Sequence, residues 1–455
     1  MLNSSFFITI LTIFSLLWVV IAWWTSRSIS TDTDYYLANR QLGVFPITLT
    51  LLATQIGGGF LSGIAQESYF VGLYGIAYAL GISAGFILLS CGIAARLRAL
   101  NIETTAELYE KCYKSSFLKK VASTLSIISL WGILVAQIVA FKTIMNGLGI
   151  QSEMVSLLFW LSVIIYTMIG GLKASVFIDI FKETFVIVMF FGIFLWSFFN
   201  EPTSWLSSTN LAIFQQSFDA NISIAQIIPV FIMPTLFCLI EQDLAQCFFS
   251  ARNQKVAVTS AIYSSIFLLL FAIAPVYFGM KAKLDNLPII GTANPLIVVL
   301  DALCSPIIFS LAIIALIAAI STTANSLLCA VSGNISLDFD TNWLSTKNKL
   351  RSSKIITLIA GLSALLAAYN VTDRIVEILT VSYELSVSCL LVSSLIAYYK
   401  KDVYKNAAAA SIICGLFGFI FFRIFPPPLN KEIATLALSL FGYVAMHIIK
   451  VSSEK

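Results

Sequence analysis

The sequence predicts an all-helical protein that crosses a lipid bilayer many times. Of its 455 residues, 59% are hydrophobic and only 11% are charged, whereas soluble domains carry about 25% charged residues. Apolar stretches of roughly 20 residues, the length that spans a bilayer core, follow one another along the chain. The mean hydropathy of +0.93 agrees with this pattern. Lipid is therefore the expected solvent for most of the chain, with helices satisfying their own backbone hydrogen bonds.

Thirteen spans are expected from this rule, and the gaps between them are too short for a second domain. No Lys or Arg precedes the first span and no small-residue cleavage site follows it, so we interpret it as a retained anchor rather than a signal peptide. The predicted spans are 6–24, 44–68, 75–95, 121–145, 154–170, 175–199, 224–248, 256–279, 306–333, 354–370, 375–399, 406–425 and 432–450.

The distribution of Lys and Arg predicts the orientation of these spans. If the N-terminus is outside, the loops that face the cytoplasm hold twenty Lys and Arg residues and the opposite side holds five. This bias follows the positive-inside rule. We therefore expect a multi-pass protein of the plasma (inner) membrane with its N-terminus outside and its C-terminus in the cytoplasm.

Composition also excludes several classes of protein. A net charge of +4, dispersed along the chain, is too small to indicate a nucleic-acid partner. The eight Cys include no C-x-x-C pair and His447 is the only histidine, so neither a zinc site nor a disulfide framework is expected. The sequence contains no H-E-x-x-H or G-x-S-x-G motif, which argues against an intramembrane enzyme. The sequence makes no prediction of the oligomeric state.

Two spans contain helix-breaking residues in corresponding positions. Gly57, Gly58 and Gly59 interrupt the second span, and Pro229 and Pro234 interrupt the seventh. Each such residue weakens a helix interior, glycine through backbone entropy and proline through a lost hydrogen bond. Ordinary kinks are one interpretation. Because the two spans are five apart, the pattern also predicts two five-helix repeats, and matched breaks in two halves indicate a transporter's binding site.

The chain is expected to form a single transmembrane domain, because the gaps between its spans are too short for a second one. Since each repeat has five helices, an odd number, one repeat would be inverted relative to the other. We divide residues 1–455 into an extra N-terminal helix (1–30), a first five-helix repeat (31–200), an inverted second repeat (220–400) and two C-terminal helices (401–455).

The ninth span carries a group of oxygen ligands on one face. Ala318, Ser321 and Thr322 are spaced i, i+3, i+4, which aligns them on a helix. Two hydroxyl oxygens and one carbonyl, with carbonyls of the unwound second span near Ala53 and Ile56, would suit a small hard cation. The alternative is that the hydroxyls bond back to their own helix or bridge neighbouring helices.

Four ordered blocks of sequence resemble the sodium:solute symporter family. They lie at residues 31–63, 170–185, 241–253 and 320–339, and they read TDTDYYLANRQLGVFPITLTLLATQIGGGFLSG, GGLKASVFIDIFKETF, EQDLAQCFFSARN and ISTTANSLLCAVSGNISLDF. The resemblance implies the five-plus-five inverted-repeat fold of the bacterial leucine transporter and sodium-coupled import of a solute. Within the family the chain is most similar to the choline- and proline-transporter-like branches.

The resemblance implies a sodium site. The family's sodium ligands correspond to the carbonyls of Ala53, Ile56 and Ala318 and the hydroxyls of Ser321 and Thr322. Sodium is thus the expected transported ion.

Asp179 matches the family's signature aspartate, near the point where sodium would leave, although it could instead cap its helix or pair with Lys182. Lys182 stands where the family usually has Gln. An intramembrane charge is a candidate functional group, so a proton-coupled or sodium-independent carrier that uses Lys182 is an alternative. A non-transporting sensor of the same fold is another.

Candidate solute-binding residues come from the interrupted spans: Gln55, Gly58, Gln66, Glu67, Glu241 and Gln242. Each could instead form an interhelical hydrogen bond, and Glu241 could pair with Lys142. Where the choline branch has tryptophans, this chain has Gln55, about Leu134, and Glu241, so an aromatic cage for a quaternary ammonium is not expected. The carboxylate of Glu241 favours a small amine-bearing solute, such as an amino acid or another organic amine.

Overall fold

The structure is a computed structural model, and its described residues form helices joined by short connections. One isolated β-bridge joins Leu42 to Ala251. The predicted orientation of the termini concerns Met1 and Lys455, which lie outside the described residues. The described residues are 4–27, 29, 31–150, 152–200, 224–289, 294–340, 349–371, 375–400, 403–427 and 430–453.

The helices follow one another in the order that the hydropathy pattern predicts. In the first half they are α1 (Ser4–Ser26), α2 (Asp32–Leu37), η1 (Ala38–Arg40), α3 (Val44–Gln55), η2 (Gly59–Gly63), α4 (Ile64–Val71), η3 (Gly72–Ile76), α5 (Ala77–Leu88), η4 (Leu89–Ile93), α6 (Ala94–Ala99), α7 (Glu107–Tyr113), α8 (Ser116–Gly147) and α9 (Glu153–Asn200). In the second half they are α12 (Ile224–Phe237), α13 (Gln242–Phe249), α14 (Gln254–Leu284), α15 (Pro295–Leu303), α16 (Pro306–Asp338), α17 (Lys349–Ala368), α18 (Ile375–Tyr399), α19 (Lys405–Ile424) and α20 (Lys431–Ser453).

Among the described residues, eleven stretches are long and apolar enough to cross a membrane. One of them, α9, folds back on itself at Gly171, where φ is +49°. The side chains of Tyr166 and Lys182 meet at 3.1 Å although they are sixteen residues apart, a separation of about 24 Å along a straight helix. α9 therefore consists of two segments that lie against each other. The count of thirteen crossings stays a prediction.

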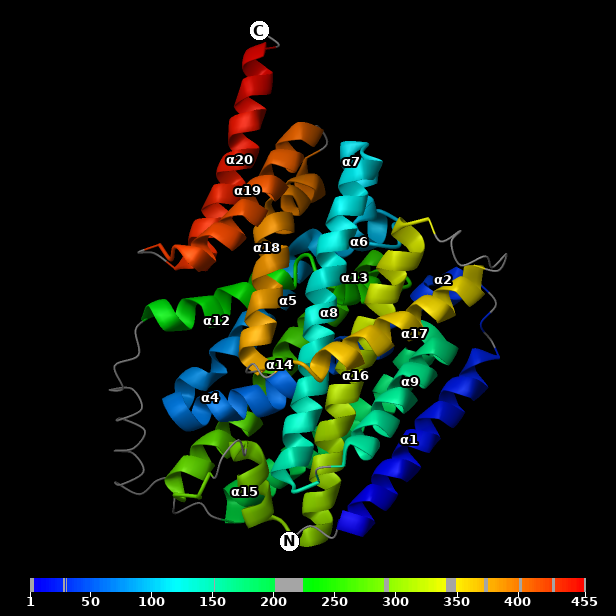
Figure 1. Ribbon diagram of the computed structural model, residues 1–455, viewed down its shortest axis with the longest axis vertical. Helices are drawn as coiled ribbons and strands as arrows, with labels where there is room; N and C mark the ends of the chain where they lie inside the picture. The colour runs from blue at the N-terminus through cyan, green and yellow to red at the C-terminus, as the bar shows by residue number, and fades with distance from the viewer. Residues whose placement is uncertain are drawn as a thin grey trace.

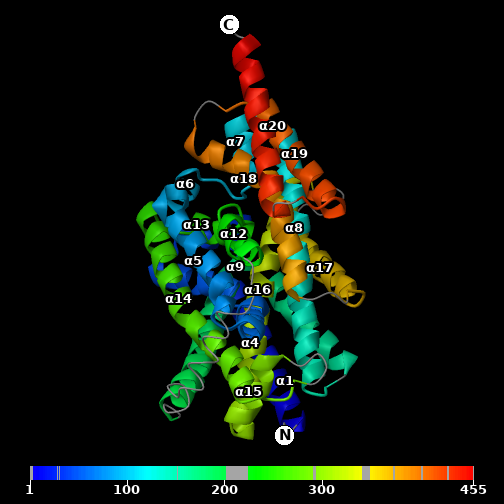
Figure 2. The ribbon, with the colours of Figure 1, turned by 90° about the vertical axis from the view of Figure 1, so that its left-hand side faces the viewer.

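α16 is the most deeply buried of the long helices, with 83% of its apolar window inside the protein. It packs against α8, α9, α17 and α3, and α14 packs against α3, α4 and α5. α19 and α20 pack against each other and against α18 at one end (Figure 1). The start of α1 and the end of α20 lie at opposite ends of the long axis, as a second view also shows (Figure 2).

The first predicted interruption is present where the sequence placed it. α3 ends at Gln55, and helical structure resumes at Gly59. Gly57 is required there by close packing, because a Cβ at this position would lie 2.5 Å from Thr323 Oγ1. Gly58 donates its N–H to Gln137 Oε1 at 3.2 Å, so a side chain from α8 replaces the acceptor that the helix has lost.

The second interruption lies further along the chain than predicted. Pro229 and Pro234 are both inside α12, which continues to Phe237. The break covers residues 238–241, and α13 begins directly after Glu241, whose backbone is extended (ψ 128°). A proline removes one hydrogen bond but lets a helix continue with a kink. Glu241 is therefore part of the break itself.

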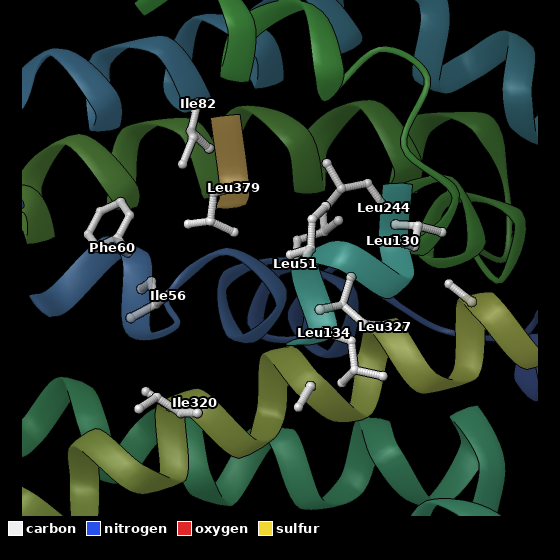
Figure 3. Packing of buried hydrophobic residues seen from close by; sticks show 14 of the residues in the cluster. Leu51, Ile56, Phe60, Ile82, Leu130, Leu134, Leu244, Ile320, Leu327 and Leu379 are labelled. Atoms are coloured by element: carbon white, nitrogen blue, oxygen red, sulfur yellow. The ribbon is translucent and has the colours of Figure 1, made fainter. Parts of the chain in front are cut away.

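Both breaks lie within the main apolar core. The side chains labelled in Figure 3 come from α3, η2, α5, α8, α13, α16 and α18 and fill the space between these helices. Because packed interiors leave few voids, any polar group at this depth must have a specific partner or lie in a pocket.

Gly171→Ala is expected to destabilise the protein strongly. Its φ of +49° with ψ of −158° suits glycine alone and costs another residue about 1–3 kcal/mol. A Cβ would also lie 2.5 Å from the Tyr35 carbonyl oxygen. The measurement is thermal unfolding of the purified protein in detergent. Gly192→Ala is the control on the same helix, since a Cβ there meets nothing within 4 Å. Equal unfolding temperatures for the two variants would contradict the turn at Gly171.

Candidate functional site

The two broken helices meet at an enclosed pocket in the core, here called the central pocket. Its volume is about 20 Å³, which is room for about one water molecule. A larger solute therefore requires the surrounding helices to move. The pocket is lined by Thr54, Gln55, Gly57, Gly59, Phe60, Tyr78, Ile133, Gln137, Glu241, Asp243, Thr323, Leu327, Leu379 and Tyr383.

Two buried carboxyl groups face this pocket from the second break. Glu241 is 6% exposed and Asp243 is 2% exposed, and the two groups are close enough to interact directly. The side chain of Glu241 accepts only a long hydrogen bond from Gln55 Nε2, at 3.5 Å. Asp243 Oδ2 has no hydrogen-bond partner. Among the described residues no Lys or Arg forms an ion pair with either group, so the two carboxyl groups have no cationic side chain beside them.

Aromatic side chains also line the central pocket. The hydroxyls of Tyr78 on α5 and Tyr383 on α18 share a hydrogen bond of 2.9 Å, and Phe60 follows the first break. Gln55 and Glu241, which stand where the choline branch has tryptophans, line the pocket, and its aromatic side chains come from other positions. Phe60, Tyr78 and Tyr383 were not predicted because nothing in the local sequence distinguishes them from residues of ordinary spans. Asp243 was not predicted either, although a charge within the span 224–248 is a signal that could have found it.

A second pocket of about 80 Å³ adjoins the central one. The two pockets share Gly59, Tyr78, Leu379 and Tyr383 in their walls, so the pair of tyrosines stands between them. Glu67 lines the second pocket and not the central one.

The remaining predicted solute ligands lie elsewhere. Gly58 lines neither pocket, although its N–H donates to Gln137, which lines the central pocket. Gln66 is half-buried and lines neither pocket. Gln242 points to a different part of the protein, where its Oε1 accepts from the Thr105 N–H at 2.6 Å and its Nε2 donates to the Glu103 carbonyl at 3.4 Å. It fastens the loop before α7 to α13, which is a structural role.

Lys142 does not neutralise Glu241. Its ammonium lies 4.4 Å from the ring centre of Tyr369, directly after α17, and not at the second break. The structural alternative for Glu241, an ion pair with Lys142, is therefore absent from the described residues.

The two segments expected to bind sodium lie side by side. Thr323 Oγ1 donates to the Ala53 carbonyl at 3.1 Å, and Thr54 Oγ1 donates to Ser326 Oγ at 3.1 Å. Ile56 is the first residue beyond α3, and its ψ of 74° turns its carbonyl out of the helical direction. The break therefore presents backbone oxygens next to the middle of α16.

The hydroxyls of α16 bond to their own helix. Ser321 Oγ donates to the Ala318 carbonyl and Thr322 Oγ1 to the Ala319 carbonyl, each at 2.8 Å. This is the alternative that the spacing left open. It remains compatible with cation binding, because a hydroxyl that donates its proton keeps oxygen lone pairs for a ligand.

Lys182 contacts this same region from α9. Its Nζ donates to Ser321 Oγ at 2.7 Å and to the Tyr166 hydroxyl at 3.1 Å. Asp179 and Glu183, on the same helix, are fully buried. Lys182 and Asn325 act on Asp179 electrostatically, but neither carboxylate has a hydrogen bond of normal geometry. The predicted pairing of Asp179 with Lys182 is not present as an ion pair.

A family model described as "Sodium:solute symporter family" matches residues 35–415. Among solved structures, the chain is similar to a Na+-coupled sialic acid symporter in a substrate-bound, outward-open state, with a TM-score of 0.80, 16% identity and 97% of each chain covered. It is also similar to Mhp1, a nucleobase-cation-symport-1 family transporter in a closed conformation, with a TM-score of 0.58, 14% identity, and 92% of this chain and 95% of that chain covered.

Proposed function

The chain belongs to the sodium:solute symporter family, and we propose that its central pocket binds a small, positively charged, amine-bearing solute. Membership confirms that the protein is a multi-pass membrane transporter that couples symport of a small solute to sodium, and not an enzyme. The similar structures confirm the all-helical, five-plus-five inverted-repeat fold.

The observation that carries this proposal is the pair of buried carboxyl groups, Glu241 and Asp243, without a cationic partner among the described residues. Two acidic groups at this depth repel each other and lack hydration. A solute ammonium balances their charge and supplies N–H donors. The faces of Tyr78, Tyr383 and Phe60 add attraction for a cation.

Other solute classes fit this pocket less well. Sialic acid, named for the similar symporter, bears a carboxylate, which would be repelled by Glu241 and Asp243. A quaternary ammonium would be attracted by charge and by the aromatic wall but offers no N–H group to the carboxylates or to Gln55. An amine with N–H donors uses all of these groups.

The first break supports coupling between the solute and sodium. The side chain of Gln55 lies in the central pocket, while the carbonyls of Ala53 and Ile56 are candidate sodium ligands on the same short segment. We propose that Ala53, Ile56, Ala318, Ser321 and Thr322 hold the transported sodium. Sodium then fixes the shape of the break, and with it the position of Gln55 beside Glu241.

The solute class is testable by thermal unfolding of the purified protein in the presence of sodium. The panel contains primary amines, amino acids, choline, neutral polyols and sugar acids. We expect concentration-dependent stabilisation by compounds whose ammonium group bears N–H donors, weaker stabilisation by choline, and none by the alcohol analogues. Strongest stabilisation by a sugar acid or a neutral polyol would contradict the proposed solute class.

The distribution of Lys and Arg supports the proposed orientation of the protein in the membrane. The twenty-to-five bias of Lys and Arg supports an N-terminus outside and a C-terminus in the cytoplasm of the plasma (inner) membrane. The proposed divisions at 1–30, 31–200, 220–400 and 401–455 place one broken helix near the start of each repeat. A tag before Met1 is expected to be accessible from outside intact cells, and a tag after Lys455 only from the cytoplasm.

A further inference from the structure

We propose that the ammonium of Lys182 is a tethered competitor of sodium, which binds Ser321 when sodium is absent and moves to Asp179 when sodium binds. The inference rests on the sodium ligands of the proposed function. It concerns Lys182, which stands where the family usually has Gln, and it assigns the Lys182 ammonium a role in sodium binding.

The position of the ammonium is the first support. Lys182 is 1% exposed, and its Nζ reaches Ser321 Oγ at 2.7 Å and the Tyr166 hydroxyl at 3.1 Å. The rings of Tyr166 and Trp18 lie 4.7 and 5.2 Å from it, within the range of cation–π attraction. A built site therefore surrounds this positive charge, with two hydroxyl oxygens and two aromatic faces.

The chemistry of Ser321 makes the two cations exclusive. Its hydroxyl proton is donated to the Ala318 carbonyl, so only the oxygen lone pairs remain for a ligand. The ammonium already uses this oxygen. A sodium ion bound to the same oxygen would lie a few ångströms from a second positive charge, where repulsion in a protein interior is strong. Sodium binding thus requires Lys182 to withdraw.

A destination for the ammonium lies on the same helix. Asp179 precedes Lys182 by three residues, which places the two side chains on one face. Both oxygens of Asp179, and both of the adjacent Glu183, are buried without a hydrogen bond of normal geometry. Buried carboxylates in this state are costly. An ammonium that leaves Ser321 would satisfy Asp179, so each of two positions of Lys182 has its own partners.

The test is binding of ²²Na⁺ to the purified full chain at one fixed pH. Lys182→Gln and Lys182→Met are expected to lower the half-saturating sodium concentration at least tenfold, since the competitor is gone. Lys182→Arg keeps the charge and is expected to retain weak binding. Lys142→Gln is the matched control, because it removes a lysine that contacts Tyr369 and not the site.

A milder variant tests the same competition if the Lys182 variants do not fold. Tyr166→Phe keeps the ring but removes one of the two hydrogen bonds to the ammonium, and it is expected to raise sodium affinity by a smaller factor. If folded Lys182→Gln or Tyr166→Phe protein binds sodium no more tightly than the wild type, or more weakly, the competition is refuted.

Double variants test the two positions of the ammonium. The gain from Lys182→Gln should vanish in a Ser321→Ala background, because the shared oxygen is absent there. Asp179→Asn should weaken sodium binding in the wild type but change it little in a Lys182→Gln background. A loss that persists in that background would show that Asp179 acts on sodium directly and would overturn its role as the destination. These measurements omit the solute, so they stand apart from the test of the solute class.

Discussion

Glu241→Gln is expected to raise the apparent dissociation constant of an amine-bearing solute at least tenfold, equal to about 1.4 kcal/mol. The amide keeps the size of the side chain and removes the charge that pairs with the solute ammonium. Sodium affinity without solute should be unchanged, since Glu241 lies on the second break and the proposed sodium ligands lie on α3, at the first break and on α16. Isothermal titration of the solute at saturating sodium measures the effect.

Glu384→Gln is the matched control for this prediction. Glu384 is also buried, but it forms an ion pair with Arg423 at 2.9 Å. Breaking a buried pair by removing one partner is destabilising, so this variant should lower the unfolding temperature without changing solute affinity. Glu241 has no cationic partner among the described residues, so its variant should unfold no earlier than the wild type. Normal solute affinity with lowered stability in Glu241→Gln would assign Glu241 a structural role.

Replacing both Ser321 and Thr322 by Ala is expected to raise the half-saturating sodium concentration about a hundredfold, or about 2.7 kcal/mol. The double variant removes two of five oxygen ligands, and an interaction with a charged partner contributes about 1.5–3 kcal/mol. Thr322→Ala alone should have a larger effect than Ser321→Ala alone, because loss of the Ser321 hydroxyl also releases its competitor, Lys182.

Ser332→Ala is the control on the same helix. Ser332 is buried and donates to the carbonyl three residues earlier, Cys329, at 3.2 Å, so it reproduces the hydrogen-bonding pattern of Ser321 away from the proposed ligands. Sodium binding measured with ²²Na⁺ should be normal in this variant. Similar losses in Ser332→Ala and in the double variant would point to a general defect of α16 and not to lost ligands.

The sequence predicted the first break well because its cause is local. Three consecutive glycines weaken the helix wherever they occur, and close packing against Thr323 then requires Gly57 in particular. The second break has no such local cause. Pro229 and Pro234 stay within α12, and the chain leaves the helix at 238–241, where Tyr398 donates to the Leu239 carbonyl at 3.5 Å. That contact comes from α18, far away in the sequence.

The composition of the central pocket was only partly predictable for the same reason. Glu241 stood out as a charge in an apolar span, but its neighbour Gln242 looked equally suitable and points instead to the loop before α7. Tyr78 and Tyr383 are ordinary residues in their own spans, and their meeting depends on how α5 and α18 pack. Lys182 was noticed as a departure from the family pattern. Its contact with Ser321 was not predictable from the sequence, because it depends on the reversal of α9 at Gly171.

Uptake into proteoliposomes tests the central claim, sodium-coupled symport of an amine-bearing solute, most directly. The radiolabelled compound is the amine that stabilises the protein most in the thermal panel. We predict that an inward sodium gradient drives its accumulation above equilibrium, that potassium does not replace sodium, and that Glu241→Gln reduces the uptake at subsaturating solute. Uptake that is unchanged when potassium replaces sodium, and that instead follows a pH gradient, would contradict the account.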